Sequence, residues 1–222
     1  VYKSTSVAER MTLREAMTRY CKEIVPTLKS ATQDLSKANI IEPYLGSYPL
    51  ITLDGEILAN YRDKRLAMNA RNVRHYKDGR TETVWRNRKV AKGTVRHELV
   101  FISRVIEHGR REWGVHLPGG NPIRLGKLPP IGKPRDRRME SDEEERLLEF
   151  LDHANDKTGQ RSIYMLSLFI FALETASRRS EIVRLRWDDV DLKKRTALLR
   201  DTKNGEDRRI GLSTRAVEAL MQ

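Results

Sequence analysis

Thr175-Ala-Ser-Arg-Arg-Ser-Glu-Ile-Val-Arg-Leu-Arg-Trp-Asp-Asp-Val-Asp191 sets an arginine pair directly before apolar residues at helical spacing. The pattern predicts a helix that opens at Arg178 and Arg179 and buries one side. Trp187 is expected to close the following turn, and short strands come next. The residues expected on the buried side are Ile182, Val183 and Leu185.

Lys203 stands next to Asn204-Gly205, a strong signal for a two-residue hairpin turn. The strands expected on either side are 196–199 and 208–212. An arginine at a helix start and a lysine at a hairpin tip would both be offered to an anion, and a phosphate suits them. Taken singly, Arg178 can also be a solvated surface arginine and Lys203 an ordinary turn lysine.

The composition points to a polyanionic partner. The 222 residues include 43 Lys and Arg against 31 Asp and Glu, which gives a net charge of +12. Hydrophobic residues make up 38% and charged residues 33%, a polar but foldable balance. Nucleic acid explains this excess better than a general need for solubility does.

Other functional classes are disfavoured. The single cysteine, Cys21, excludes an intrachain disulfide and a cysteine zinc cluster, and the five histidines lack metal-ligand spacing. We see no apolar run of transmembrane length and no signal-peptide pattern at the start. We therefore expect a soluble cytoplasmic protein, associated with the nucleoid, with no membrane partner.

Periodic apolar residues predict four helices in the N-terminal half, over about 12–24, 32–44, 54–66 and 94–113. Thr12 and Glu15 form a capping box before the first, and Asp54 caps the third. Residues 1–11 are expected to be loose, and Leu35 is expected to face inward. Helices are also expected over 141–154, 161–174 and from Ser213 onward.

Residues 71–92 form the most basic stretch, and Asp78-Gly79 between β-forming residues predicts a short hairpin or an ordered loop there. This stretch either contacts DNA phosphates, with Tyr76 or Trp85 on the sugar, or is a solvated charge run. Residues 118–140 are rich in proline and glycine, so we expect a helix-free basic linker, which is either a DNA-following tether or a plain connection. The predicted DNA-binding residues are Arg71, Arg74, Lys77, Arg80, Arg86, Arg88, Lys89, Arg96, Arg104, Lys133 and Arg135.

The stretch from Thr175 to Asp191 resembles the first catalytic arginine box of the tyrosine recombinases, the phage-type integrases. Their pattern is Thr-Gly-x-Arg-x-x-Glu followed by Leu-x-Trp-x-Asp-Ile-Asp. The resemblance implies that Arg178 clamps a DNA phosphate, that Glu181 orients it, and that Lys203 protonates the leaving sugar oxygen. Ala176 replaces the usual glycine, which is expected to tighten the helix entry.

The resemblance also implies a fold. We expect a mainly α protein, with a helical core-binding domain over 1–117 that carries the basic insert, the linker over 118–140, and the N-terminal half of a catalytic domain over 141–222. That half is α+β with a small antiparallel sheet. The helices over 58–66 and 95–105 resemble helices of the same family.

The implied reaction is site-specific DNA recombination through a phosphotyrosine, on double-stranded DNA, by a homotetramer, with no metal or other cofactor. All seven tyrosines precede Arg178, and none fits the nucleophile by order. We therefore expect an inactive fragment of a longer recombinase. One alternative is a truncated, non-catalytic DNA-binding module. Another is a nuclease, which is disfavoured because the sequence lacks a cluster of acidic residues that could bind a metal.

Overall fold

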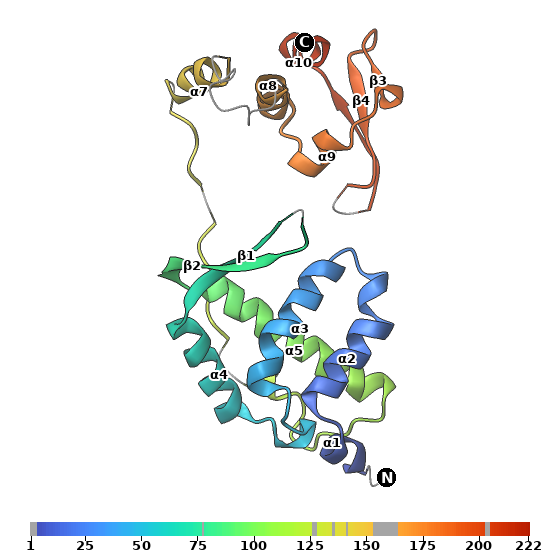
Figure 1. Ribbon diagram of the computed structural model, residues 1–222. Helices are drawn as coiled ribbons and strands as arrows, with labels where there is room; N and C mark the ends of the chain where they lie inside the picture. Colours follow the sequence, from blue (N-terminus) through green and yellow to red (C-terminus); the bar gives the residue numbers. More distant parts are fainter. Residues whose placement is uncertain are drawn as a thin grey trace. The chain divides into compact units, whose positions relative to one another are not determined.

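The computed structural model describes residues 4–76, 78–125, 128–134, 136–140, 142–152, 164–202 and 205–222, without the side chains at 74, 75 and 125. The chain divides into two compact units, Val1–Pro134 and Arg135–Gln222. Figure 1 shows the helices of the first unit from blue to green and those of the second from yellow to red. Among the described residues, no helix combines the length and the apolar character needed to cross a bilayer.

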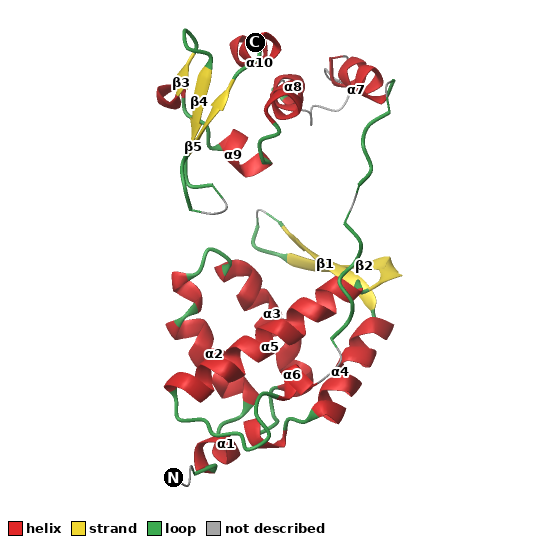
Figure 2. Ribbon diagram, turned by 180° about the vertical axis from the view of Figure 1, so that it is seen from behind, coloured by secondary structure: helices red, strands yellow, loops and turns green. Residues whose placement is uncertain are grey.

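The first unit is a bundle of helices, and the four predicted helices are confirmed (Figure 2). They are α2 (Leu13–Glu23), α3 (Ala31–Leu45), α4 (Gly55–Ala67) and α5 (Lys92–Glu112). Short pieces complete the unit: α1 (Ser6–Arg10), η1 (Val25–Thr27), η2 (Leu50–Thr52) and α6 (Pro122–Leu125).

Predicted caps set two of these helix starts. The hydroxyl oxygen of Thr12 accepts a hydrogen bond from the Glu15 amide at 3.2 Å, and the Glu15 carboxylate accepts one from the Thr12 amide at 2.8 Å. The carboxylate of Asp54 accepts the Ile57 amide at 2.9 Å, at the start of α4. These side chains satisfy backbone N–H groups that a helix start leaves without partners.

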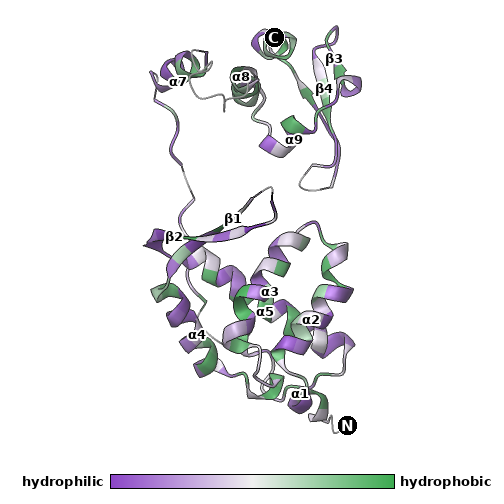
Figure 3. Ribbon diagram, in the orientation of Figure 1, coloured by the Kyte–Doolittle hydropathy of each residue, from purple (hydrophilic) through white to green (hydrophobic). Residues whose placement is uncertain are grey.

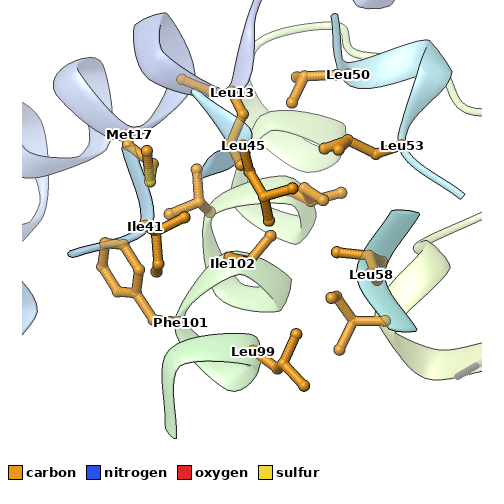
Figure 4. Packing of buried hydrophobic residues seen from close by; sticks show 14 of the residues in the cluster. Leu13, Met17, Ile41, Leu45, Leu50, Leu53, Leu58, Leu99, Phe101 and Ile102 are labelled. Carbon is orange, nitrogen blue, oxygen red and sulfur yellow. The ribbon is translucent and has the colours of Figure 1, made fainter. Parts of the chain in front are cut away.

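The core of the first unit lies where α2, α3, α4 and α5 meet (Figure 4). Leu13, Ile41, Leu50, Phe101 and Ile102 are fully buried in it. The close-up also shows the following residues in this cluster: Met17, Leu45, Leu53, Leu58 and Leu99.

Two expectations about this core are wrong. Residues 1–11 were expected to be loose, but α1 forms over Ser6–Arg10, because Ala8 is buried in the core and anchors it; residues 1–3 lie outside the described part. Leu35 was expected to face inward, yet its exposed fraction is 46%. The neighbouring Asp34 takes the buried position instead, because ion pairs from Lys37 and Arg104 satisfy its carboxylate.

A buried polar cluster joins α4 to α5. Glu98 has an exposed fraction of 1%, and its two carboxylate oxygens accept hydrogen bonds from Arg65 Nη2 at 2.7 Å and Nε at 3.0 Å. The Tyr61 hydroxyl donates to the same carboxylate at 2.8 Å. A buried carboxylate is tolerated because it is paired and hydrogen-bonded in this way.

The basic stretch forms an antiparallel hairpin, β1 (Asn69–His75) with β2 (Thr81–Lys89), as predicted. The amide of Gly79 donates to the Tyr76 carbonyl at 3.0 Å, and Gly79 has a φ of 82°, which glycine adopts without strain. Arg71 lies opposite Trp85, and the register shifts between Asn69 and Arg71. All described residues of β2 except Val84 are exposed, so the hairpin presents both faces to solvent.

The expectation of a helix-free linker over 118–140 is wrong at its N-terminal end. The short helix α6 forms there, and Ile123 is buried in the core of the first unit together with Val115 and Leu117. Proline is tolerated because Pro122 occupies the first helical position, where no amide hydrogen is needed. The described residues from 131 to 140 are exposed and lie outside helices and strands.

The second unit combines helices with a small antiparallel sheet. Its helices are α7 (Glu143–Asp152), α8 (Met165–Thr175), α9 (Arg179–Val183), η3 (Trp187–Asp189) and α10 (Thr214–Met221). The sheet has the order β3 (Val190–Asp191), β4 (Thr196–Leu199), β5 (Arg208–Gly211). Both predicted strands flanking Lys203 are therefore confirmed.

The core of the second unit is small. Phe171, Ala197, Leu212 and Ala216 are buried together, on α8, on β4, between β5 and α10, and on α10 respectively. Figure 3 shows mostly hydrophobic colour on α8, whereas α10 carries both hydrophilic and hydrophobic colours. Ser213 caps α10 as predicted, accepting the Ala216 amide at 3.0 Å. Phe171 anchors α8, whose C-terminal end leads to Arg178.

Candidate phosphate site and nucleic-acid interface

The turn from α8 to α9 brings Arg178 to the surface. Ala176 ends α8 in the left-handed region, with φ 49° and ψ 28°. The Thr175 hydroxyl donates back to the Phe171 carbonyl at 2.7 Å and so closes the last turn of α8. Arg178 then returns to extended geometry as the residue that precedes α9. The expected tightness at Ala176 is thus a strained backbone, because an alanine occupies a conformation that favours glycine.

Arg178 is fixed by Glu181, one turn into α9. The backbone amide of Arg178 donates to Glu181 Oε2 at 3.0 Å, and the side-chain nitrogen Nη1 of Arg178 donates to Glu181 Oε1 at 2.7 Å. The Glu181 side chain has an exposed fraction of 3% and the Arg178 side chain one of 53%. One edge of the guanidinium is therefore anchored on a buried carboxylate, while the side chain remains accessible to a ligand.

A third residue joins this pair from a distant point in the chain. Arg208 opens β5, and its Nη2 donates to Glu181 Oε2 at 3.1 Å. No periodic signal in the sequence predicts this contact, because it joins residues of two elements that lie far apart in the chain. The one available hint is the strand prediction, which puts Arg208 at the start of the strand that follows Lys203.

The contacts keep Glu181 ionised. The backbone N–H of Arg178, then its guanidinium, and to a smaller extent Arg208, hold the pKa of Glu181 below its ordinary value. The carboxylate can therefore orient both arginines at neutral pH.

The rest of the stretch from Thr175 to Asp191 follows the prediction, with one correction. Ile182 and Leu185 pack on the core of the second unit, but Val183 has an exposed fraction of 69%, so its expected burial is wrong. The reason is length: α9 is a single short turn, so the helix lacks a wide buried face. Asp189, two residues after Trp187, is buried, and both of its carboxylate oxygens accept hydrogen bonds from Arg200 at 2.6–3.0 Å.

Lys203 and Asn204 lie outside the described residues, so the lysine's position stays a prediction. The two residues that flank them are joined by a hydrogen bond, from the Gly205 amide to the Thr202 carbonyl at 2.8 Å. Gly205 has a φ of 87°. Thr202 is buried.

Five of the predicted DNA-binding residues are exposed together on the hairpin: Arg71, Arg80, Arg86, Arg88 and Lys89. Lys89 donates to the Ala67 carbonyl at 2.7 Å, and Arg80 pairs with Asp78 at 2.6 Å. Arg71, Arg88 and Lys89 also line a cavity of about 470 Å³ under the hairpin, against α3. A two-stranded ribbon that carries cations on exposed faces has the shape and charge to contact duplex DNA.

The other predicted cations are dispersed. Arg96 donates to the Pro129 carbonyl at 2.8 Å, and Arg104 pairs with the buried Asp34 at 2.9 Å, so both also hold the first unit together. Lys133 is exposed in the segment after α6. Arg74 belongs to β1 by its backbone, whereas Lys77 and Arg135 lie outside the described residues.

No metal centre is found in the part of the chain that the structure describes, where no three His, Cys, Asp or Glu side chains gather as ligands would. The cations of the candidate site that the structure describes are arginines, Arg178 and Arg208.

Comparison with known proteins agrees with this fold. The model of the phage integrase family matches residues 137–222. A shufflon-specific DNA recombinase of Escherichia coli is 33% identical over 212 residues, covering 93% of this chain and 48% of that protein. Residues 137–222 belong to the phage integrase family by this match, and the relative extends the similarity over most of the chain. The chain spans less than half the length of the curated relatives it matches.

Solved structures show the same fold. The integrase of the transposon Tn1549, in complex with circular intermediate DNA, superposes with a TM-score of 0.66 at 16% identity, covering 95% of this chain and 64% of that one. A lambda integrase tetramer bound to a Holliday junction superposes with a TM-score of 0.68 at 15% identity, covering 97% of this chain and 57% of that one.

Proposed function

We propose that the chain is part of a site-specific DNA recombinase that binds duplex DNA and cleaves and rejoins it through a phosphotyrosine in the full-length protein. The observation that carries the proposal is the accessible Arg178 guanidinium held on the buried Glu181 carboxylate. Recombinase relatives and integrase folds solved on DNA support it.

Each proposed role follows from the chemistry of the side chain. In the cleavage step a tyrosine oxygen bonds to phosphorus while the bond from phosphorus to the sugar oxygen breaks. Arg178 would hold the phosphoryl oxygens on which negative charge grows, and Lys203 would give the departing oxygen its proton. Glu181 would keep Arg178 in place. The nucleophile is assigned to none of the seven tyrosines present.

The first unit would supply most of the DNA affinity. We assign the core-binding role to the helical region with its hairpin, and the tether role to the exposed segment before α7. Residues 141–222 would then form the first half of the catalytic domain. Exposed hairpin cations would neutralise phosphates without reading bases. Assembly into a homotetramer at the nucleoid, where the target DNA lies, completes the proposal, supported by the lambda integrase structure.

A suicide DNA substrate, incubated with the complete gene product, tests the catalytic part. A covalent protein–DNA adduct should form, and Arg178→Ala should slow its formation by about 10²–10³-fold, as expected when a stabilising donor is removed. The control is Arg179→Ala, which alters the adjacent arginine that begins α9. Equal adduct formation by both variants would contradict the role of Arg178.

The second candidate is a DNA-binding module that does not cut, favoured by the exposed cations of the hairpin, which can bind phosphates without a nucleophile. It predicts salt-dependent duplex binding with no adduct from the complete gene product. A complete product that binds duplex without any adduct would replace the first proposal with this one.

A further inference from the structure

Two arginines from separate elements share one buried carboxylate. Arg178 precedes α9 and Arg208 begins β5, two elements that Figure 2 labels. Their nitrogens lie 2.7 Å and 3.1 Å from different oxygens of Glu181. Arg178 and Arg208 have exposed side-chain fractions of 53% and 46%, against 3% for Glu181. The cluster thus has an anionic centre that is covered and two cationic groups that are not.

The charge balance of this cluster decides how well it binds a phosphate. A guanidinium paired with one carboxylate is neutral overall, so the pair of Arg178 and Glu181 alone attracts an anion weakly. The second guanidinium, from Arg208, restores one net positive charge. An arginine also has five N–H donors in a planar fork, so Arg178 can bind Glu181 along one edge and a phosphate along another.

Resting on the proposed function, we infer that Arg208 is a positioning residue of the phosphate site. Arg208 holds the Glu181 side chain and offsets the negative charge of Glu181. The positive charge of Arg178 is then not cancelled by Glu181 and can attract a DNA phosphate. The role acts through Glu181 and requires no contact between Arg208 and DNA.

The next residue along β5 provides a matched control. Successive side chains of a strand point to opposite faces, and Arg209 accordingly makes a different contact, from Nη1 to the Thr196 hydroxyl at 3.4 Å. Arg209→Ala removes the same charge from the same strand without touching Glu181. Any effect of net charge alone should therefore be equal in Arg208→Ala and Arg209→Ala.

The test is a double-substitution cycle on the 222-residue chain, read as affinity for a fluorescent duplex of mixed sequence over a series of salt concentrations. Arg208→Ala should weaken binding about tenfold, and Arg209→Ala at most about twofold. In the Arg178→Ala background, Arg208→Ala should have almost no further effect, since the residue that it positions is gone. Arg208→Lys, which keeps the charge without the fork, should recover most of the affinity.

The decisive arm is suppression by Glu181→Gln. Glu181→Gln weakens the anchor of Arg178 in both backgrounds, but it also removes the charge that Arg208 offsets. The substitution should therefore be more favourable to binding in the Arg208→Ala background than in the wild-type chain. A residue needed only for folding would show no such difference. An equal effect in both backgrounds, or equal weakening by Arg208→Ala and Arg209→Ala, would overturn the inference. Additive effects of Arg178→Ala and Arg208→Ala would do so as well, because they would place Arg208 directly on DNA.

A measurement without DNA separates this inference from the proposed function. Carbon NMR of the Glu181 carboxyl should show a higher pKa in Arg208→Ala than in the wild-type chain, and an unchanged pKa in Arg209→Ala. If the wild-type chain binds no duplex, the proposed function fails and the inference with it, even where this pKa shift is seen. If the wild-type chain binds duplex and the pKa does not move, the inference alone fails.

Discussion

Ala176 has a strained backbone conformation and lies close in sequence to Arg178, the residue proposed to bind phosphate. It holds a left-handed conformation, with φ 49°, two positions before Arg178. The conformation is unfavourable for a side chain with a Cβ and is readily adopted by glycine.

Ala176→Gly should therefore stabilise the second unit by about 1 kcal/mol, measured by urea unfolding followed by circular dichroism. The matched control is Ala172→Gly inside α8, which should destabilise by about 1 kcal/mol. If both changes destabilise, the left-handed geometry at Ala176 is incorrect.

Glu181 gives the second prediction for single residues, a pH dependence of stability. Its pKa in the folded chain is lowered, chiefly by the Arg178 backbone N–H. The unfolded state therefore binds a proton more readily than the folded state does. The stabilisation by Glu181 is complete above about pH 4.5, the range where an ordinary glutamate titrates, and disappears as pH falls through the lowered folded pKa.

The comparison to make is the free energy of unfolding of the wild-type chain and of Glu181→Gln, from neutral pH downward. The advantage of the wild-type chain should shrink as the solution becomes acidic. An advantage that grows on acidification would mean that the pKa of Glu181 is raised rather than lowered.

At the scale of elements, local sequence predicted the helices well. Three helix starts could be predicted because a side chain there accepts a hydrogen bond from a nearby backbone amide. Such bonds depend on only a few neighbouring residues, and the side chains are those of Thr12, Asp54 and Ser213. Contacts between distant elements were not predictable in this way. Glu98 with Arg65 and Glu181 with Arg208 each join separate elements, and a single sequence holds no periodic signal for such pairs.

The buried cluster between α4 and α5 yields a prediction of stability. Glu98→Ala removes the acceptor of both Arg65 and Tyr61 and leaves a guanidinium in the core, so it should destabilise the first unit by about 3–5 kcal/mol. Glu112→Ala, an exposed position at the end of α5, should change stability by less than about 0.5 kcal/mol. Thermal unfolding measures both, and equal effects would show that the cluster contributes little.

The hairpin yields a prediction of binding. Substituting Arg71, Arg86 and Arg88 with alanine should reduce the salt slope of duplex binding by about 0.9 for each phosphate that is no longer neutralised, or about 2.7 in all. The control replaces three exposed cations of the region from α1 to α3, Arg10, Lys22 and Lys29, and removes the same charge. Matching slopes for the two triple variants would show that the hairpin has no special place in DNA binding.

At the scale of the molecule, the pattern along the chain and the family resemblance predicted two domains, but they did not predict where the first unit ends. Residues 118–140 look like a linker by their proline and glycine content, yet Ile123 belongs to the first core and the compact units divide after Pro134. A few apolar residues without helical periodicity are too weak a signal to show this packing in advance.

Limited trypsin digestion should accordingly cut first between Lys133 and Arg138, in the exposed stretch between the units, and leave both units largely intact. Early cleavage within α5 instead would show that the first unit is less compact than its buried core indicates.

The proposed function depends above all on one contact: Arg178, held by Glu181, would bind a phosphate of the DNA backbone. A crystal structure of the chain on a duplex measures this contact most directly. An Arg178 guanidinium nitrogen should lie within hydrogen-bonding distance of a phosphate oxygen, with the Glu181 contact kept. A bound duplex with no phosphate within reach of Arg178 would contradict the proposed role.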